Sequence, residues 1–489
     1  MIDRLPVEVF LNCLDFLSKN EQLECLSVNK SLYNAIQISG KLHESIVVSK
    51  PKDFASMRTF FDKNKEFSKQ VKKLQIINVR LDINAYMALP VLFPNIKEFS
   101  FVNPDYPIRG YNSRKVLAAF NPWAVTLTSL KEAGTPVIAF TLLSKKSCPQ
   151  LQRLSLDILG IDDEEKKFVL YDYLKSCPNL KILDLNFANT TLEHMEKIHK
   201  YLPNLKTLLF RDIGFPESRF KSTPAPAHSM ETLFLDEITF LGNMDMWLVY
   251  FSQKYPNLRN LIIGKAEDMY DGQIAYEDKY EASLVKLVTG LKTLEFYSVQ
   301  CLKLTSAVFD AMDRAGVRLK KIELGIYEAE DSFPLLVKSQ QITSLTSLTI
   351  SGTSYESMAY GDKKKFIQDL AKFPNLKHFR INQSKEEVDG PQSNRVPLDF
   401  MLESLRSLES MQMDFFTLEI TREMEEPFDT KLKKLVIEEC YVEALALKGQ
   451  EDWNERSEAY LRKLLPNTDI EVRWLDDTPL DEEYSHLFQ

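Results

Sequence analysis

Proline and leucine recur along this chain in a fixed order, and the order predicts repeating strand–helix units. Six prolines stand directly ahead of the spacing Leu-x-x-Leu-x-Leu or a close variant, and four of the six begin the tripeptide Pro-Asn-Leu. The six segments are Pro94-Asn95-Ile96, Pro149-Gln150-Leu151, Pro178-Asn179-Leu180, Pro203-Asn204-Leu205, Pro256-Asn257-Leu258 and Pro374-Asn375-Leu376. Proline cannot continue a helix, and it biases the residue before it away from the helical region. Each segment therefore predicts a helix that ends, followed by a short strand.

The residues after each proline alternate between apolar and polar, which is the period of a strand. Leu183 and Leu185 fall on one face, and Asp184 falls on the other. The preceding apolar positions predict a helix over Leu192–Tyr201 that ends before Pro203. A single strand–helix unit cannot bury its apolar face alone, so neighbouring units must share one core.

Weaker copies of the pattern fill the gaps and bring the total to about 14, separated by roughly 24–33 residues. They include Leu291-Leu294-Phe296 and a degenerate copy at Leu127–Leu130. The fullest copy is Leu432-x-x-Leu435-x-Ile437-x-x-Cys440-x-Val442, which fits the complete leucine-rich-repeat pattern. The array resembles the irregular, cysteine-containing type of leucine-rich repeat. The expected fold class is α/β: a curved solenoid with parallel strands on the concave face and helices on the convex face.

The first forty residues have helical rather than strand periodicity. Val9, Phe10, Cys13, Leu14 and Leu17 make one broad apolar stripe, and two shorter helices are expected around 23–27 and 31–36. Forty residues are too few to bury a core of their own. We therefore expect this three-helix unit to pack against the repeats or against a partner.

This segment closely resembles the F-box family, whose pattern is Leu-Pro-x-Glu, an apolar run and a second leucine stretch that closes in Val-x-Lys/Arg and an aromatic residue. A leucine, Leu32, stands where many members have tryptophan. The resemblance implies binding to a Skp-type adaptor through the matching positions, which are Leu5, Pro6, Glu8, Val9, Leu11, Cys13, Leu17, Leu23, Leu26, Val28, Lys30 and Tyr33. The alternative is a purely structural role, in which this segment is a helix that caps the repeat array.

An F-box ahead of leucine-rich repeats is similar to the F-box/leucine-rich-repeat family. The resemblance implies a substrate-recognition subunit of an SCF-type cullin–RING ubiquitin ligase, joined to a cullin through the adaptor. The alternatives are a non-degradative, adaptor-bound scaffold and a leucine-rich-repeat interaction module. The expected domains are the F-box (1–42), the repeats (43–475) and an acidic tail (476–489).

Composition narrows the class of protein further. The formal net charge of −9 argues against nucleic-acid binding. No apolar run reaches 18 residues, so no membrane span is expected. The six cysteines are too few and too scattered for a disulfide framework, so we expect reduced core side chains and a cytoplasmic or nuclear location.

The motifs of catalysis are absent from the sequence. It contains no C-x-x-C pair, no glycine-rich phosphate loop and no G-x-S-x-G elbow. His194 and His199 are five residues apart, which is not the spacing of a helical zinc site. We expect a protein that is not an enzyme and needs no metal or other cofactor.

Two features suggest where a target protein could bind. Long insertions follow several strands, at 103–114, 214–229, 265–282, 352–363 and 383–397, and three of them contain tyrosines. On the concave face, the residue between the last two strand leucines should point to solvent. Three successive apolar residues, Leu209, Phe234 and Ile262, interrupt this otherwise polar row. Exposed apolar clusters tend to mark interaction sites, although the tail or a rim loop could cover this one.

We therefore predict a substrate surface around these three apolar residues. Arg211 and Asp236 would form its polar edge, Tyr270 and Tyr276 would assist from the rim, and Glu295 and Glu323 would extend it into an acidic region.

Overall fold

The structure is a computed structural model of the whole chain. It describes residues 44–473 apart from 103–112, 135, 159–163, 187–188, 218–222, 242–243, 265, 269–279, 301, 326–328, 352–362, 383–394, 415, 424–425 and 445–452, together with Cys13, Leu17, Glu21, Glu24 and Cys25. The chain separates into two compact units, Met1–Gly214 and Phe215–Gln489. The division falls inside the expected repeat array, so a single body over 43–475 stays a prediction.

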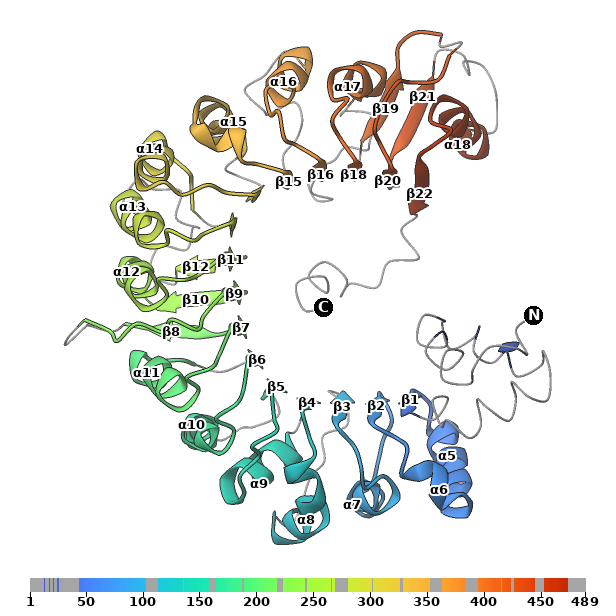
Figure 1. Cartoon of the computed structure of the whole chain (residues 1–489), viewed down its shortest axis with the longest axis vertical. Coiled ribbons are helices and arrows are strands. Elements are labelled where there is room, and N and C mark those ends of the chain that lie inside the picture. The colour runs from blue at the N-terminus through green and yellow to red at the C-terminus, as the bar shows by residue number, and fades with distance from the viewer. Residues whose placement is uncertain are drawn as a thin grey trace. The chain divides into compact units, whose positions relative to one another are not determined.

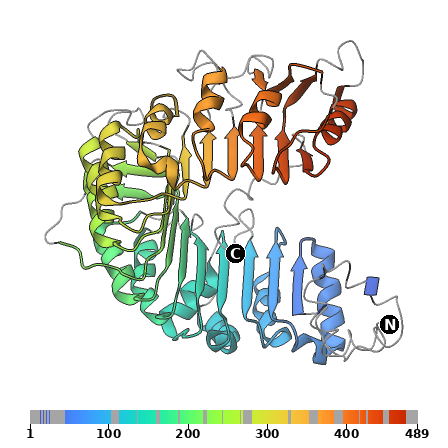
Figure 2. The same cartoon turned by 45° about the horizontal axis from the view of Figure 1, so that its top comes forward.

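The first unit is a row of parallel strands with a helix after almost every strand. Its strands pair in chain order, β1 to β7. Figure 1 shows that the helices of this unit lie on one side of the strand row, and Figure 2 shows its strands pointing the same way. The elements are β1 (Ser45–Val48), α5 (Pro51–Lys63), α6 (Lys65–Ser68), β2 (Lys73–Ile77), α7 (Ile83–Leu92), β3 (Glu98–Val102), α8 (Ser113–Phe120), η3 (Asn121–Val125), β4 (Ser129–Ala133), α9 (Val137–Lys145), β5 (Arg153–Asp157), α10 (Glu164–Tyr173), η4 (Leu174–Ser176), β6 (Ile182–Asn186), α11 (Leu192–Tyr201) and β7 (Thr207–Arg211).

The second unit repeats this plan. Its main sheet has the order β9-β11-β13-β14-β15-β16-β18-β20-β22, with every neighbouring pair parallel. The elements up to β15 are β8 (Gly214–Pro216), β9 (Thr232–Asp236), β10 (Ile238–Leu241), α12 (Met244–Lys254), β11 (Asn260–Ile263), β12 (Ala266–Asp268), α13 (Glu281–Gly290), β13 (Phe296–Val299), α14 (Ser306–Ala315), β14 (Lys321–Leu324), α15 (Ala329–Lys338), η6 (Gln340–Thr343) and β15 (Ser347–Ser351). The remainder are α16 (Lys363–Leu370), β16 (His378–Asn382), β17 (Arg395–Pro397), α17 (Leu398–Ser404), β18 (Ser410–Asp414), β19 (Thr417–Ile420), β20 (Lys434–Glu438), β21 (Tyr441–Ala444), α18 (Trp453–Leu464) and β22 (Asp469–Arg473).

The predicted α/β class with a long parallel sheet is confirmed, and so is the helix over Leu192–Tyr201. Within the described residues the two main rows hold seven and nine strands, two more than the 14 copies found in the sequence. The additional strands, β1 and β22, lie at the two ends. Two further sheets of three parallel strands were not foreseen, with the orders β12-β10-β8 and β17-β19-β21. Three of these short strands, β8, β12 and β17, lie in stretches predicted to be long loops.

Alternation along the strands explains the core. Leu183 and Leu185 have no exposed surface, whereas the Asp184 side chain is 16% exposed. The cysteines behave less uniformly than expected: Cys148, Cys177 and Cys440 are buried, but Cys13 is exposed and Cys25 is partly exposed. The expectation of a core side chain is therefore wrong for Cys13. Cys301 lies outside the described residues.

In four repeats the asparagine that follows the motif proline ties the repeat to the preceding one. Its side-chain amide donates a hydrogen bond to a backbone carbonyl 26–32 residues earlier in the chain. The four bonds run from Asn95 to Lys69 (2.9 Å), from Asn179 to Pro149 (2.9 Å), from Asn257 to His228 (2.8 Å) and from Asn375 to Thr343 (2.8 Å).

One core position departs from the leucine pattern for a structural reason. Glu132 on β4 aligns with Phe101 and Leu156 of its neighbours, and it is fully buried. Its Oε1 accepts hydrogen bonds from the Tyr86 hydroxyl (2.8 Å) and the Ile138 amide (3.0 Å). Its Oε2 accepts a bond from the Ala139 amide at 2.7 Å. The carboxyl group thus satisfies the first amides of α9, whose N-cap residue is proline.

Glu132 should make stability depend on pH near neutrality. Burial outweighs its hydrogen bonds and raises the pKa of Glu132 from 4.5 to about 7. Between these values the folded chain holds a proton that the unfolded chain has lost, so the free energy of unfolding should fall as the pH rises from 5 to 8. Glu132→Gln keeps a neutral side chain there and should flatten this fall. The measurement is chemical denaturation of both proteins at pH 5, 6, 7 and 8; equal slopes would contradict the assignment.

Candidate protein-binding surfaces

The strand register defines which side chains stand on the outer side of each main sheet, meaning the face opposite the leucine core and the helices. We call the central line of these residues the middle row. In the first unit it consists of Val47, Gln75, Ser100, Lys131, Ser155, Asp184 and Leu209. In the second unit it consists of Phe234, Ile262, Ser298, Glu323, Thr349, Arg380, Gln412, Val436 and Glu471.

The register corrects one predicted site residue. Ile262 aligns with Ser298, so the prediction that Glu295 stands in the middle row is wrong, and Glu295 precedes β13. The sequence offers two overlapping leucine patterns here, starting at Leu291 and at Leu294. Helix α13 runs to Gly290 with Leu291 as its C-cap, and the Leu294 amide bonds the Leu291 carbonyl as Leu258 bonds Tyr255 one repeat earlier. Leu294 is therefore the equivalent of Leu258, and the pattern starts there.

The predicted apolar surface is buried rather than exposed. Leu209, Phe234 and Ile262 are 2%, 1% and 0% exposed, respectively. Alternation fixes which side of a sheet a residue occupies, but exposure depends on its neighbours on that side. The premise of an exposed apolar strip is wrong, and binding of a partner there stays a prediction.

The other predicted substrate residues differ in how exposed they are. Glu323 is 6% exposed, and Asp236 is partly exposed, with its carboxylate accepting from the Glu237 amide at 3.1 Å. Tyr270 and Tyr276 lie outside the described residues.

The middle row of the first unit is mostly polar and carries a hydrogen-bonded network. Arg211 Nη1 donates to Asp184 Oδ1 at 3.0 Å, and the Ser155 hydroxyl donates to Asp184 Oδ2 at 2.8 Å. Lys131 is exposed beside them. Ser100 Oγ and Asn186 Oδ1 are buried atoms without a hydrogen-bond partner. We call Ser100, Lys131, Ser155, Asp184, Asn186 and Arg211 the polar patch.

A second network lies on the outer side of the second unit. Asp414 accepts bonds from Arg380 Nε (3.2 Å) and Nη2 (3.1 Å). Burial raises the pKa of Asp414 to about 6, against the opposing charge of Arg380. The Asp414 side chain is only 3% exposed, compared with 16% for Asp184, so this pair favours a structural role over a binding one.

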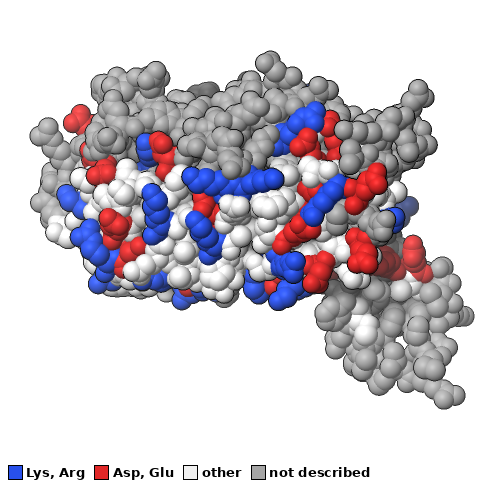
Figure 3. Space-filling view, turned by 90° about the horizontal axis from the view of Figure 1, so that it is seen from above, with Lys and Arg blue, Asp and Glu red and all other residues white. Residues whose placement is uncertain are grey.

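Charges of both signs are mixed on the surface. On the face shown in Figure 3, blue and red side chains alternate over the described part, and neither sign forms a separate field there. Within the described ranges no group of three or more His, Cys, Asp or Glu side chains could hold a metal ion. No described helix is long and apolar enough to cross a membrane.

Ten of the twelve predicted adaptor-binding residues lie outside the described residues: Leu5, Pro6, Glu8, Val9, Leu11, Leu23, Leu26, Val28, Lys30 and Tyr33. The two that are described are Cys13, which is exposed, and Leu17, which is partly buried.

Comparison with known proteins identifies the first segment. Residues 2–43 match the family model of the F-box domain. The chain thus carries an F-box domain ahead of its repeating strand–helix units, and its predicted resemblance to the F-box is confirmed. No curated protein matches the chain.

Solved structures include distant matches. One is an internalin (inlF) from Listeria monocytogenes, with 13% identity over 87% of this chain and 94% of the other, at a TM-score of 0.35. Another is TLR13 in a TLR13–ssRNA13 complex, with 15% identity over 90% of this chain and a TM-score of 0.38. The match spans 59% of the TLR13 chain.

The burial of Phe234 leads to a clear expectation for mutants. Phe234→Asp should destabilise the protein by at least about 3–5 kcal/mol, the range for removing a buried phenylalanine, because it also buries a charge. Gln75→Asp, at the same row position in β2 but partly exposed, should change stability by no more than about 0.5 kcal/mol. Urea unfolding of both variants measures the difference. If Phe234→Asp proves as stable as Gln75→Asp, the Phe234 side chain is exposed rather than buried, and the expectation is wrong.

Proposed function

We propose that this chain is the substrate-recognition subunit of an SCF-type cullin–RING ubiquitin ligase. The observation that carries the proposal is the F-box match over residues 2–43, placed directly before the repeat units. F-box domains typically bind Skp-type adaptors, and repeat arrays offer extended binding surfaces. The chain itself would supply binding and no catalytic group, because the ligase chemistry belongs to other subunits.

The F-box should carry the connection to the ligase. The unit is too small to close a core of its own, so its apolar residues should dock on the adaptor. The double substitution Leu5→Ala, Pro6→Ala should abolish co-purification of adaptor and cullin, while the circular dichroism of the repeat units stays unchanged. Undiminished co-purification would remove the ligase assignment. Turnover of captured proteins, compared between wild type and this variant, separates a degradative receptor from a scaffold.

For substrate binding we propose the polar patch of the first unit in place of the buried apolar strip. Its support is the exposed cation of Lys131 beside the Asp184–Arg211 pair.

Charge reversal at Lys131 tests this surface. Lys131→Glu should reduce substrate capture about tenfold, because it sets a carboxylate against the group that the ammonium attracts, and it should leave adaptor binding intact. The matched control is Lys175→Glu, which changes another exposed lysine on the helix side of the same unit. The two variants are compared by quantitative affinity purification under proteasome inhibition. Equal capture by both would exclude the polar patch but leave the F-box assignment standing.

A further inference from the structure

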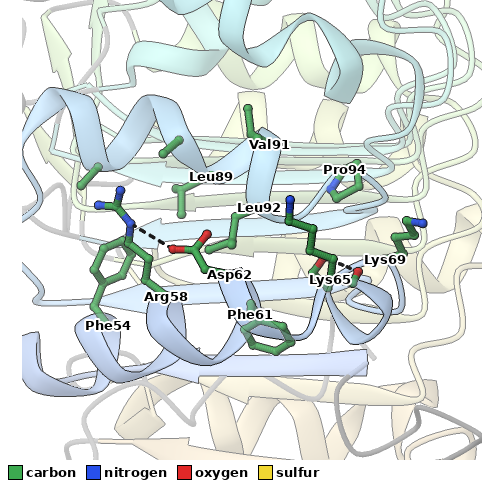
Figure 4. A pocket seen from close by; sticks show the side chains of 13 residues that line it. Phe54, Arg58, Phe61, Asp62, Lys65, Lys69, Leu89, Val91, Leu92 and Pro94 are labelled. Atoms are coloured by element: carbon green, nitrogen blue, oxygen red, sulfur yellow. Dashed lines mark hydrogen bonds and ion pairs between the residues drawn. The ribbon is translucent and has the colours of Figure 1, made fainter.

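The first two repeats contain a hollow on their helix side that the proposed receptor function does not use. It has a volume of about 380 Å³ and lies among α5, α6 and α7, with Lys69 after α6 and Pro94 after α7 completing its lining. Figure 4 shows Arg58 and Asp62 side by side at one end, and Lys65 and Lys69 at the other. We call this hollow the α5–α7 groove, and it is lined by Phe54, Arg58, Phe61, Asp62, Lys65, Ser68, Lys69, Ala85, Ala88, Leu89, Val91, Leu92 and Pro94.

The floor of the groove is apolar and fixed. Phe54, Phe61 and Leu89 are almost fully buried. The Phe61 ring packs edge-on against Phe93, with 5.0 Å between the ring centroids. A rigid apolar floor can receive a side chain without rearranging first, which favours binding.

The rim exposes apolar surface that a monomeric surface helix does not need. Val91 on α7 is 83% exposed and lines the groove. Among the described residues five large apolar side chains are exposed, and three of them, Val47, Phe60 and Val91, belong to β1, α5 and α7. Of these three, Val91 is the one that lines the groove, and it offers a partner apolar surface at the rim.

The groove has a net positive charge, whereas the chain as a whole is negatively charged. Three cations and one carboxylate line it, although the chain as a whole has a net charge of −9. The cations are held by weak pairs: Arg58 Nε lies 3.8 Å from Asp62, and Lys69 Nζ lies 3.6 Å from Glu66, with every one of these side chains more than half exposed. Exposed pairs of this kind contribute little to stability, so an incoming carboxylate can replace them.

We propose that the α5–α7 groove binds an acidic amphipathic helix of a partner protein. Apolar side chains at i and i+4 of that helix would fill the hollow over Phe54, Phe61 and Leu89, and its flanking carboxylates would face Arg58, Lys65 and Lys69. This is the helix-in-groove mode of recognition. The enclosed apolar floor favours a protruding side chain over the flat anionic surface of a membrane. The site lies next to the F-box in the chain, so its partner would be held near the adaptor.

The direct test uses the full chain and two synthetic helical peptides. One has leucine at i, i+4 and i+7 with glutamate on the other faces, and the second is its lysine-for-glutamate twin. Fluorescence anisotropy should show the acidic peptide binding at least about tenfold more tightly than the basic one. Val91→Glu should weaken the acidic peptide about tenfold or more, whereas Val125→Glu should change its affinity less than about twofold. Val125 is a fair control because it is 63% exposed in the same unit, on η3, and does not line the groove.

A double charge reversal gives a readout that loss of folding cannot imitate. Lys65→Glu, Lys69→Glu should invert the preference, so that the basic peptide binds more tightly than the acidic one. Failure to discriminate between the peptides, equal losses in the Val91 and Val125 variants, or binding that requires anionic vesicles would each overturn the proposal. None of these substitutions touches the F-box, so adaptor co-purification is measured alongside, and its outcome is independent of the groove.

Discussion

The hydrogen bond from the motif asparagine to the preceding repeat is the constraint that sets the spacing in four of the repeats. Each amide of Asn95, Asn179, Asn257 and Asn375 reaches a carbonyl one repeat earlier, at the point where a helix has just ended and a strand is about to begin. There the backbone has left its helical partners and has not yet joined the sheet. A side-chain donor at this turn satisfies the exposed carbonyl and fixes the spacing of neighbouring strands. The leucine that follows is then delivered into the shared core.

This division of labour explains why the three residues of the motif stand in a fixed order. Proline ends the helix, asparagine links the repeats, and leucine fills the core. Glu132 shows that the pattern tolerates a departure when other groups compensate. A carboxyl group replaces a core leucine, yet Tyr86 and the first amides of α9 supply its hydrogen bonds. The repeat that looked degenerate in sequence is therefore completed by a polar contact that no leucine count could reveal.

The sequence predicted the strands and the helix ends well because both follow from local chemistry. The helix over Leu192–Tyr201 ends where Pro203 requires it to end. Prediction failed where the leucine pattern of a repeat could start at either of two residues, Leu291 or Leu294. Only the end of α13 and the strand pairing show which of them is the start. Prediction failed again for β8, β12 and β17, which are three residues long and gain their hydrogen bonds from strands elsewhere in the chain. Such short strands have no periodicity of their own.

Exposure was the least predictable property of the candidate sites. Alternation placed Phe234 and Ile262 on the outer side of their sheet, and the register agrees, yet both are buried because burial is set by neighbours in three dimensions. The α5–α7 groove escaped sequence analysis for the same reason: α5 and α7 have ordinary composition, and the hollow exists only where they meet.

The polar patch also limits what kind of partner it can bind tightly. Asp184 already accepts bonds from Arg211 and Ser155, so a partner that approaches these groups must exchange existing hydrogen bonds rather than add new ones. Replacing one hydrogen bond by another adds little to the binding free energy. A partner whose groups are misplaced binds much more weakly, because it leaves a desolvated charge unpaired. The patch is therefore better suited to selecting a partner than to holding one firmly. Firm attachment would need apolar burial, and of the five exposed large apolar side chains among the described residues of the first unit only Val47, on β1, stands in the middle row; the others lie on α5, α7, η3 and α10.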